Sequence, residues 1–154
     1  DPQVLTYLQE KEKMSYSAIN ELLVKKSGLL GISGLSTEIW ELEKAAQEGN
    51  ERALLTIEVF VYQVKKYIGS FIALMNGLDA LVFTGGIGEN DSFVREKICH
   101  NLDQVGIVID SQKNRSNDPL PKSIHNNTSQ VEVWVIPTNE ELMIARETYA
   151  YLQA

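Results

Sequence analysis

The run Ala80-Leu-Val-Phe-Thr84 is apolar up to its last residue, and Gly85-Gly-Ile-Gly-Glu-Asn90 follows it directly. A short apolar run that ends in a turn is typical of a buried strand in a parallel sheet. Val94, Ile98 and Leu102 then repeat at helical spacing. In open α/β sheets, ligands bind beyond the carboxyl ends of the strands, where the next helix begins. This stretch therefore predicts an α/β fold with a candidate binding site at the glycine-rich turn.

A second junction of the same kind lies about 50 residues further along the chain. Val131-Glu-Val-Trp-Val-Ile136 predicts a second strand, which ends at Pro137-Thr-Asn139, and a closing helix is expected from about Glu140 to Tyr151. Between the two junctions, Gly106–Asp110 is a candidate for another short strand.

Helical patterns dominate the first half of the chain. Glu51–Met75 carries apolar residues around most of its circumference, so we expect it at the centre of the fold or at a subunit interface. Shorter helices are predicted over Val4–Glu10, Tyr16–Lys26 and Thr37–Glu48. The order of helices followed by strand–helix–strand–helix indicates an α/β class with helix in excess.

Composition narrows the function. The net charge of −7 argues against nucleic acid and anionic membrane surfaces as partners, because both need a basic face. No apolar run is long enough for a membrane helix. Cys99 is the only cysteine and we expect it to be a packed thiol, so nothing points to an oxidising compartment and a cytoplasmic location is predicted. Since the sequence begins with Asp1-Pro2 and not with methionine, we also expect a piece of a longer protein.

Some residues predict little chemistry. Residues 111–130 are polar, with two prolines and four asparagines, and are expected to form a mobile loop. His100 and His125 have no metal-ligand spacing between them, and neither is expected to be functional. Trp134 lies in a predicted strand and is expected in the core.

The glycine-rich turn allows two interpretations. Glycines at positions 85, 86 and 88 would let a phosphate or an adenosine approach the backbone closely. The turn is neither a Walker loop nor a good dinucleotide fingerprint, because the residues that complete those motifs are missing. The alternative is a tight strand-to-helix turn that binds no ligand.

Glu140 is the candidate metal ligand. Thr138 and Glu141 have the spacing of a capping box, in which each side chain satisfies a free backbone N–H group of the other residue. Glu140 would then be left at the strand ends, where a carboxylate could hold Mg²⁺. Alternatively, Glu140 only complements the helix dipole.

Four motifs, in order along the chain, closely resemble the acetate kinase family. They are Ser27-Gly-Leu-Leu-Gly-Ile-Ser-Gly34, Phe60-Val-Tyr-x-Val-x-Lys-Tyr-Ile-Gly69, Val82-Phe-Thr-Gly-Gly-Ile-Gly-Glu-Asn90 and Val135-Ile-Pro-Thr-Asn-Glu-Glu-Leu142. The resemblance covers essentially the whole chain. It implies an actin-like fold of the ribonuclease H-like type, shared with sugar kinases, Hsp70 and actin, and a homodimer.

The resemblance also implies an activity, which is phosphoryl transfer between ATP and acetate or a related short carboxylate to give an acyl phosphate and ADP. Residues 1–154 correspond to the C-terminal nucleotide-binding domain. Glu140 matches the family's Mg²⁺ ligand. The implied nucleotide-binding residues are Gly86, Ile87, Gly88, Glu89 and Asn90, with Glu38, Ile39 and Trp40 near the nucleoside.

Two departures from the family pattern affect this interpretation. An Asp-x-Arg is usual where this chain has Glu38-Ile39-Trp40, so a guanidinium is absent there, and Trp40 could stack on adenine instead. The N-terminal domain of the family, with its substrate-binding and catalytic residues, has no counterpart in this sequence. No catalytic residue is therefore predicted in residues 1–154, and the chain alone is expected to bind nucleotide at most.

Two alternatives remain open at this stage. The acceptor could be propionate or butyrate, because the family's carboxylate pocket lies in the missing domain. The chain could also be a dimerisation or nucleotide-binding module without kinase activity, in which case the apolar helix Glu51–Met75 would form its interface.

Overall fold

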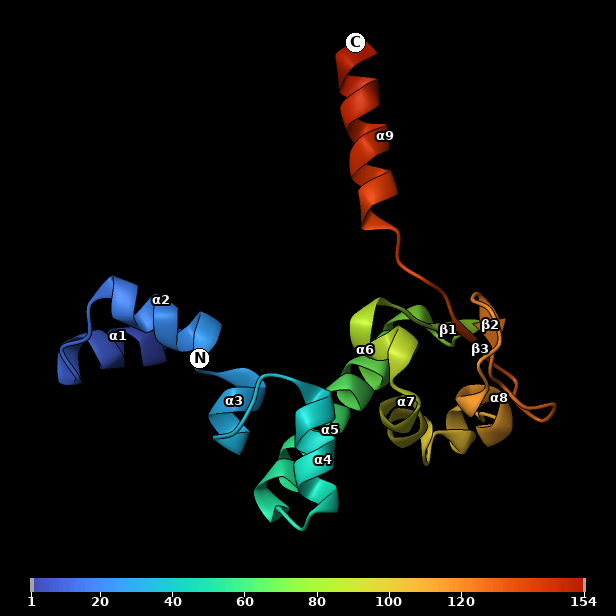
Figure 1. The fold of residues 1–154 in the computed structure, drawn as a ribbon, viewed down its shortest axis with the longest axis horizontal. Helices are drawn as coiled ribbons and strands as arrows, with labels where there is room; N and C mark the ends of the chain where they lie inside the picture. Colours follow the sequence, from blue (N-terminus) through green and yellow to red (C-terminus); the bar gives the residue numbers. More distant parts are fainter. Residues whose placement is uncertain (1, 154) are drawn as a thin grey trace. The chain divides into compact units, whose positions relative to one another are not determined.

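The computed structural model describes residues 2–153, which form helices and a small mixed sheet (Figure 1). The chain divides into two compact units, Asp1–Gln63 and Val64–Ala154, which are described separately. The predicted α/β class with helix in excess is confirmed. No helix among residues 2–153 is both long enough and apolar enough to cross a membrane.

The first unit is entirely helical in its regular structure. It contains α1 (Gln3–Lys11), α2 (Tyr16–Lys25), α3 (Gly28–Ser33), α4 (Ile39–Gln47) and the first half of α5 (Glu51–Met75). The hydroxyl of Ser15 accepts a hydrogen bond from the backbone N–H of Ala18 at 3.2 Å and caps α2, as one of two candidate serines predicted. The buried apolar side chains are Ile19, Ile39, Leu42, Ala53, Ile57 and Val61.

Helix α5 has the predicted bounds, but its burial is uneven. All its buried residues, Ala53, Thr56, Ile57 and Val61, lie in its first half. In the second half, Phe71 is 55% exposed and Leu74 is 79% exposed. Val64, Ile68 and Ile72 are half-buried there, so exposure is confined to one part of the helix surface.

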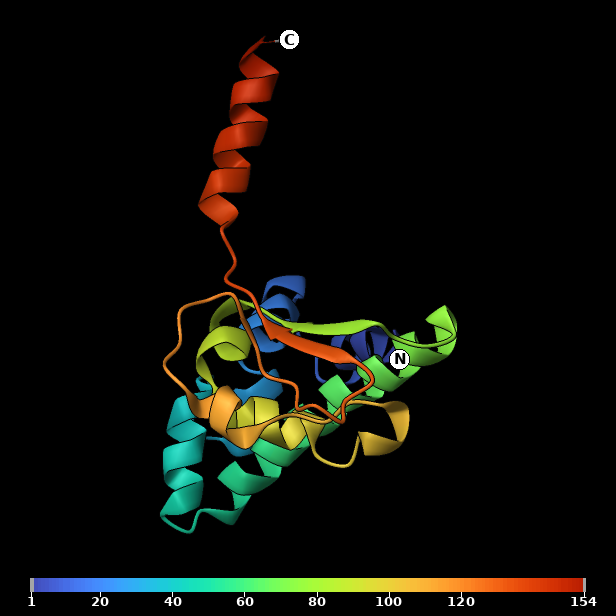
Figure 2. The ribbon, with the colours of Figure 1, turned by 90° about the vertical axis from the view of Figure 1, so that its right-hand side faces the viewer.

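The second unit contains a three-stranded sheet in the order β1-β3-β2. Strand β1 (Ala80–Phe83) pairs in parallel with β3 (Glu132–Val135), and the two lie side by side in Figure 2. Strand β2 (Lys122–Ser123) pairs antiparallel with β3. The parallel arrangement of the two predicted strands is confirmed. The prediction that β1 is buried is wrong, because only Phe83 is buried and Val82 is 46% exposed.

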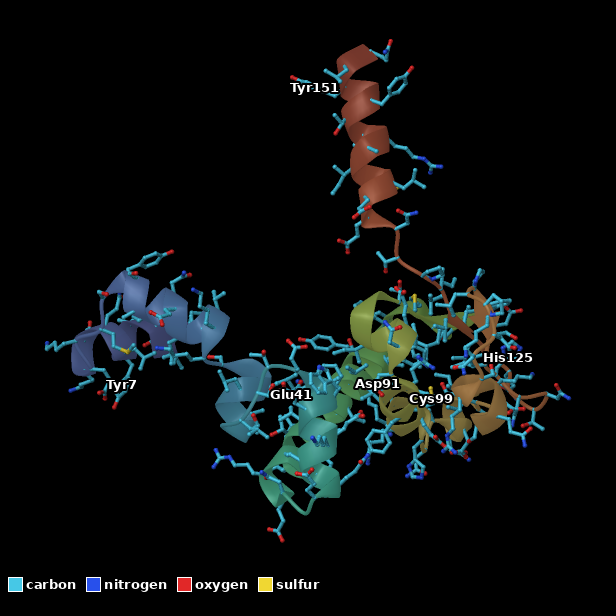
Figure 3. All side chains as sticks on the ribbon, in the orientation of Figure 1. Tyr7, Glu41, Asp91, Cys99, His125 and Tyr151 are labelled. Carbon is cyan, nitrogen blue, oxygen red and sulfur yellow. The ribbon has the colours of Figure 1, made fainter. Side chains whose placement is uncertain are left out.

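Helices of the second unit lie between these strands and after the last one. They are α6 (Gly85–Asn90), α7 (Ser92–Cys99), a 3₁₀ turn η1 (Asp103–Val105), α8 (Ser111–Arg115) and α9 (Glu140–Gln153). The buried apolar residues come from α7, β3 and the segments beside them: Phe83, Val94, Ile98, Cys99, Ile107, Ile124, Val131, Val133 and Val135. Cys99, labelled in Figure 3, is buried as predicted, and burial raises the pKa of its thiol to about 12.

Two secondary-structure predictions need correction. Residues 106–110 form no strand; only an isolated antiparallel bridge joins Ile109 to His125. The predicted loop over residues 111–130 contains α8 and β2. Asp110 caps α8, with its carboxylate accepting from the backbone N–H groups of Gln112 at 2.8 Å and Lys113 at 3.1 Å. The density of polar residues in this segment reflects caps and turns, which need Asn, Asp and Ser.

His125, predicted to be non-functional, and Trp134, predicted to be in the core, both form side-chain hydrogen bonds. His125 accepts a hydrogen bond through Nδ1 from the backbone N–H of Val133 at 3.1 Å. Trp134 is only half-buried, and its indole N–H donates to the carboxylate of Glu132 at 2.8 Å, so its expected place in the core is not found.

Burial of α4 gives a direct test of the first unit's core. Leu42 is fully buried, so Leu42→Ala should lower the free energy of unfolding by about 2–5 kcal/mol. Leu74→Ala, on the exposed part of α5, should change it by less than about 0.5 kcal/mol. Urea unfolding followed by circular dichroism measures both, and equal losses would contradict this burial pattern.

Candidate nucleotide site

The two predicted junctions meet at one edge of the sheet. Phe83 is in register with Val135, so both strands end at the same level. Beyond the strands, the hydroxyls of Thr84 and Thr138 lie 2.6 Å apart. An open cavity of about 410 Å³ lies at this edge. Its walls come from α6, the segment after β3 and the start of α9, and they comprise Gly85, Gly86, Glu89, Thr138, Asn139, Glu140 and Glu141.

Glu89 joins the two sides of this cavity. One oxygen of its carboxylate, Oε1, accepts from the backbone N–H of Gly85 at 2.7 Å and from the backbone N–H of Thr138 at 2.8 Å. The Gly85 N–H also lies 3.0 Å from the Thr138 hydroxyl, to which it donates. The bond from the Thr138 N–H is the main cause that lowers the pKa of Glu89, against the opposing effect of burial. Glu89 is therefore an ionised carboxylate fixed between both strand ends.

The three glycines of the turn serve different purposes. Gly85 has φ of +71°, a left-handed conformation that side chains rarely adopt. A Cβ on Gly88 would lie 3.2 Å from the backbone carbon of Phe83, so the helix could not pack this closely on the strand. Gly86 borders the cavity, and a Cβ there would meet nothing within 4 Å. Gly85 and Gly86 thus both border the cavity without a side chain, but the N–H group of Gly85 already donates to Glu89 and Thr138.

The predicted capping box is wrong. Asn139 caps α9, because its side-chain oxygen accepts from the backbone N–H of Leu142 at 3.0 Å. Thr138 bonds across to Thr84 and Gly85 instead. Asn139, directly before the first helical residue, takes the capping role predicted for Thr138 and Glu141. Both Glu140 and Glu141 are exposed.

The carboxylates at the cavity suit a magnesium ion. No group of three or more His, Cys, Asp or Glu side chains in the described part of the chain is arranged to hold a metal. Mg²⁺, however, usually takes one or two protein carboxylates and completes its shell with water and phosphate oxygens. The exposed oxygens of Glu140 and Glu141 provide such a donor set at the cavity. The geometry does not itself separate these two residues.

The other predicted nucleotide-binding residues lie in different surroundings. The side-chain amide of Asn90 donates to the backbone carbonyl of Gly86 at 2.9 Å and closes α6, while Ile87 is half-buried. In the first unit, Glu38 precedes α4, and Trp40 is 61% exposed. Ile39 is only 6% exposed, so its side chain is engaged in packing. The roles of these residues in nucleotide binding stay predictions.

Two buried polar residues were not predicted from the sequence, and one of them is hydrogen-bonded to α6. Arg95, on α7, is 3% exposed, and Asn114, on α8, is 1% exposed. One signal was present: Arg95 lies four residues before the buried Cys99 and next to Val94, within the apolar face of its helix. A charged residue in such a position is rarely buried without a specific partner.

Two solved structures that match this chain carry the names of carboxylate kinases. The acetate kinase of Porphyromonas gingivalis matches with a TM-score of 0.87 and 47% identity, over 99% of this chain and 38% of that one. A propionate kinase from Francisella tularensis matches with a TM-score of 0.84 and 41% identity, over 96% and 37%. The fold is therefore that of the actin-like superfamily to which acetate kinases belong, as predicted.

The chain belongs to the Acetokinase family, which matches residues 1–146. An acetate kinase of Caldicellulosiruptor saccharolyticus is 53% identical over 154 residues. The match covers 99% of this chain but only 39% of that relative. The chain thus spans about two fifths of the length of such relatives.

Glu89 should give a measurable pH dependence. Its pKa is lowered in the folded protein, so its stabilising effect is complete above its ordinary value of 4.5 and is lost as pH falls through the lowered value. Glu89→Gln keeps an oxygen acceptor but no charge. Between about pH 5 and pH 3 the wild-type carboxylate becomes protonated. We expect the loss of stability over this range to be smaller in the variant than in the wild type.

The measurement is chemical unfolding at several pH values, with Glu41→Gln on α4 as the control. If Glu89→Gln and the wild type lose stability in parallel as pH falls, the charge on Glu89 does not stabilise the folded protein.

Proposed function

We propose that the full-length enzyme to which these residues belong transfers a phosphoryl group between ATP and a short-chain carboxylate, giving an acyl phosphate and ADP. The observation that carries this proposal is the cavity at the strand ends, where the two family motifs, about 50 residues apart, come together around Gly86, Glu89 and Glu140. Membership of the Acetokinase family supports the acceptor class.

Within this proposal, the second unit binds the nucleotide phosphates. The bare backbone at Gly86 would allow a phosphate to approach, and Gly86 and Glu89 line the cavity. The part proposed for Ile87, Gly88 and Asn90 in nucleotide binding rests on the family pattern. Glu140 would hold Mg²⁺, which neutralises phosphate charge when it is bound. Choosing Glu140 over Glu141 rests on the family pattern. Glu38, Ile39 and Trp40 are proposed near the nucleoside, with the exposed indole of Trp40 available for stacking on adenine.

The residues that would clamp the transferred phosphoryl group and bind the carboxylate are proposed to lie outside this sequence. The relatives are more than twice as long as the chain, which supports this division. Phosphoryl transfer depends on positioning and on charge placed around the moving group. The chain by itself should therefore bind Mg²⁺-ADP without turning it over.

A propionate kinase is the second candidate. The Francisella tularensis propionate kinase matches almost as well as the acetate kinase from Porphyromonas gingivalis, with TM-scores of 0.84 and 0.87. The fold of this part of the chain is shared by enzymes named for both acceptors, so the acceptor has to be assayed. Steady-state rates of the full-length enzyme with acetate, propionate and butyrate would rank the three acceptors.

A homodimer is also proposed. The second half of α5 exposes Tyr67, Phe71, Leu74 and Met75, and a run of exposed apolar side chains on one helix is typical of an association surface. Such a surface would equally suit the non-catalytic module considered above. A cytoplasmic location stays a prediction.

Glu140→Ala should abolish Mg²⁺-dependent turnover of the full-length enzyme while leaving its fold intact. Removing an exposed carboxylate costs little stability, whereas losing a metal ligand removes the ion that orients the phosphates. Glu141→Ala is the matched control and should retain most of the activity. A wild-type rate from Glu140→Ala would exclude Glu140 from the site, and loss of activity only in Glu141→Ala would transfer the role to its neighbour.

For the chain itself, calorimetric titration with Mg²⁺-ADP tests the nucleotide site. We expect binding that requires the metal, and no acyl phosphate formation in the same sample. Absence of binding would contradict a nucleotide site complete within residues 1–154, and turnover would contradict the assignment of the catalytic residues to the rest of the enzyme.

A further inference from the structure

Arg95 is a buried cation with unusual partners. It is 3% exposed, and no carboxylate of residues 2–153 lies within salt-bridge distance of its guanidinium. A buried charge is costly unless it is paired or fully hydrogen-bonded. Burial accordingly lowers the pKa of Arg95, while Asp91 and Cys99 act in the opposite direction. The protein must recover this cost through the hydrogen bonds of the guanidinium.

Those bonds connect three helices. Nη1 donates to the backbone carbonyls of Gly88 and Glu89, both at 2.9 Å, at the end of α6. Nε donates to the side-chain oxygen of Asn114 at 2.8 Å, and Nη2 donates to the Asn114 backbone carbonyl at 2.9 Å. Because the guanidinium is planar and rigid, donating to these four oxygen atoms at once fixes their relative positions.

Asn114 completes the connection. Its side-chain amide donates to the backbone carbonyl of Ser92, at the start of α7, at 2.8 Å. Its oxygen accepts from Arg95, so both polar ends of the amide are used in the interior. The pair therefore ties α8 to the end of α6 and to the beginning of α7.

Arg95 and Asn114 also support Glu89, whose carboxylate joins the two strand ends at the cavity. Arg95 holds the backbone carbonyl of Glu89, and the carboxylate of Glu89 holds the N–H groups of Gly85 and Thr138 at the cavity. A displaced Glu89 backbone would move the carboxylate away from both strand ends. An unbroken series of hydrogen bonds thus leads from the interior, at Asn114, to the edge of the candidate nucleotide site.

We propose that Arg95 and Asn114 are positioning residues that set the geometry of the nucleotide site through Glu89, without touching the ligand. This inference rests on the proposed function. It also gives residues 111–115 a part in the site, although they contribute no residue to the cavity wall. Lysine cannot replace the guanidinium, because a single ammonium group cannot reach four acceptors spread over two helices.

The test uses the chain with Arg95→Lys, Asn114→Ala as a milder second variant, and Ile124→Val as the control. Ile124 is fully buried in the same unit but makes no side-chain contribution to this network. Urea unfolding shows how much stability each variant loses. Calorimetry then gives the affinity for Mg²⁺-ADP, and hydrogen exchange follows the backbone amides of Gly85 and Thr138.

We expect Arg95→Lys to weaken Mg²⁺-ADP binding by about tenfold, as is typical for loss of a supporting partner of a ligand-binding group. Asn114→Ala should weaken binding in the same direction by a smaller factor. Exchange at Gly85 and Thr138 should accelerate in both variants. Ile124→Val should leave affinity and exchange at these two amides unchanged, even where its loss of stability is comparable.

Other outcomes separate the two proposals. If Arg95→Lys and Ile124→Val change affinity and exchange equally for equal losses of stability, Arg95 is only a core residue and the positioning role is overturned. If the wild-type chain binds no Mg²⁺-ADP, the nucleotide site proposed for this chain fails. In that case, faster exchange in Arg95→Lys alone would still establish the link to the strand ends, and unchanged exchange would refute it.

Discussion

The edge of the sheet where β1 and β3 end depends on the ionised carboxylate of Glu89, which accepts hydrogen bonds from the backbone N–H groups of Gly85 and Thr138. Parallel strands pair along their length, but nothing in the pairing holds together the segments that leave them. Here the Glu89 carboxylate does so together with the Thr138 hydroxyl, which lies 2.6 Å from that of Thr84 and accepts from the N–H group of Gly85. The chain after β1 and the chain after β3 are thus bound to each other at the edge of the cavity.

The residues around Glu89 each contribute to the structure of the edge where the candidate site lies. Gly85 supplies the left-handed turn, Gly88 allows close packing on Phe83, and Arg95 and Asn114 support the opposite end of the short helix. None of these requirements involves a ligand. Packing gives no reason for a glycine at position 86, which borders the cavity.

Periodicity predicted the elements well, because apolar spacing is a local property of the sequence. The bounds of α5 and the parallel pair β1–β3 are the clearest cases. Burial and capping were harder to predict. Apolar spacing predicted burial for Phe71 and Leu74 on α5 and for Val82 on β1, but all three are exposed. Asn139, and not Thr138, caps α9. Arg95 was missed because its partner Asn114 lies 19 residues away, beyond the reach of any local pattern.

Cys99 has a practical consequence as the only thiol of the chain. Burial raises its pKa to about 12, so the reactive thiolate is disfavoured in the folded second unit and alkylation of Cys99 should be slow. Local unfolding around α7 would expose the thiol and lower its pKa. The rate of labelling should therefore rise with the opening of this part of the chain, which needs no engineered residue as a probe.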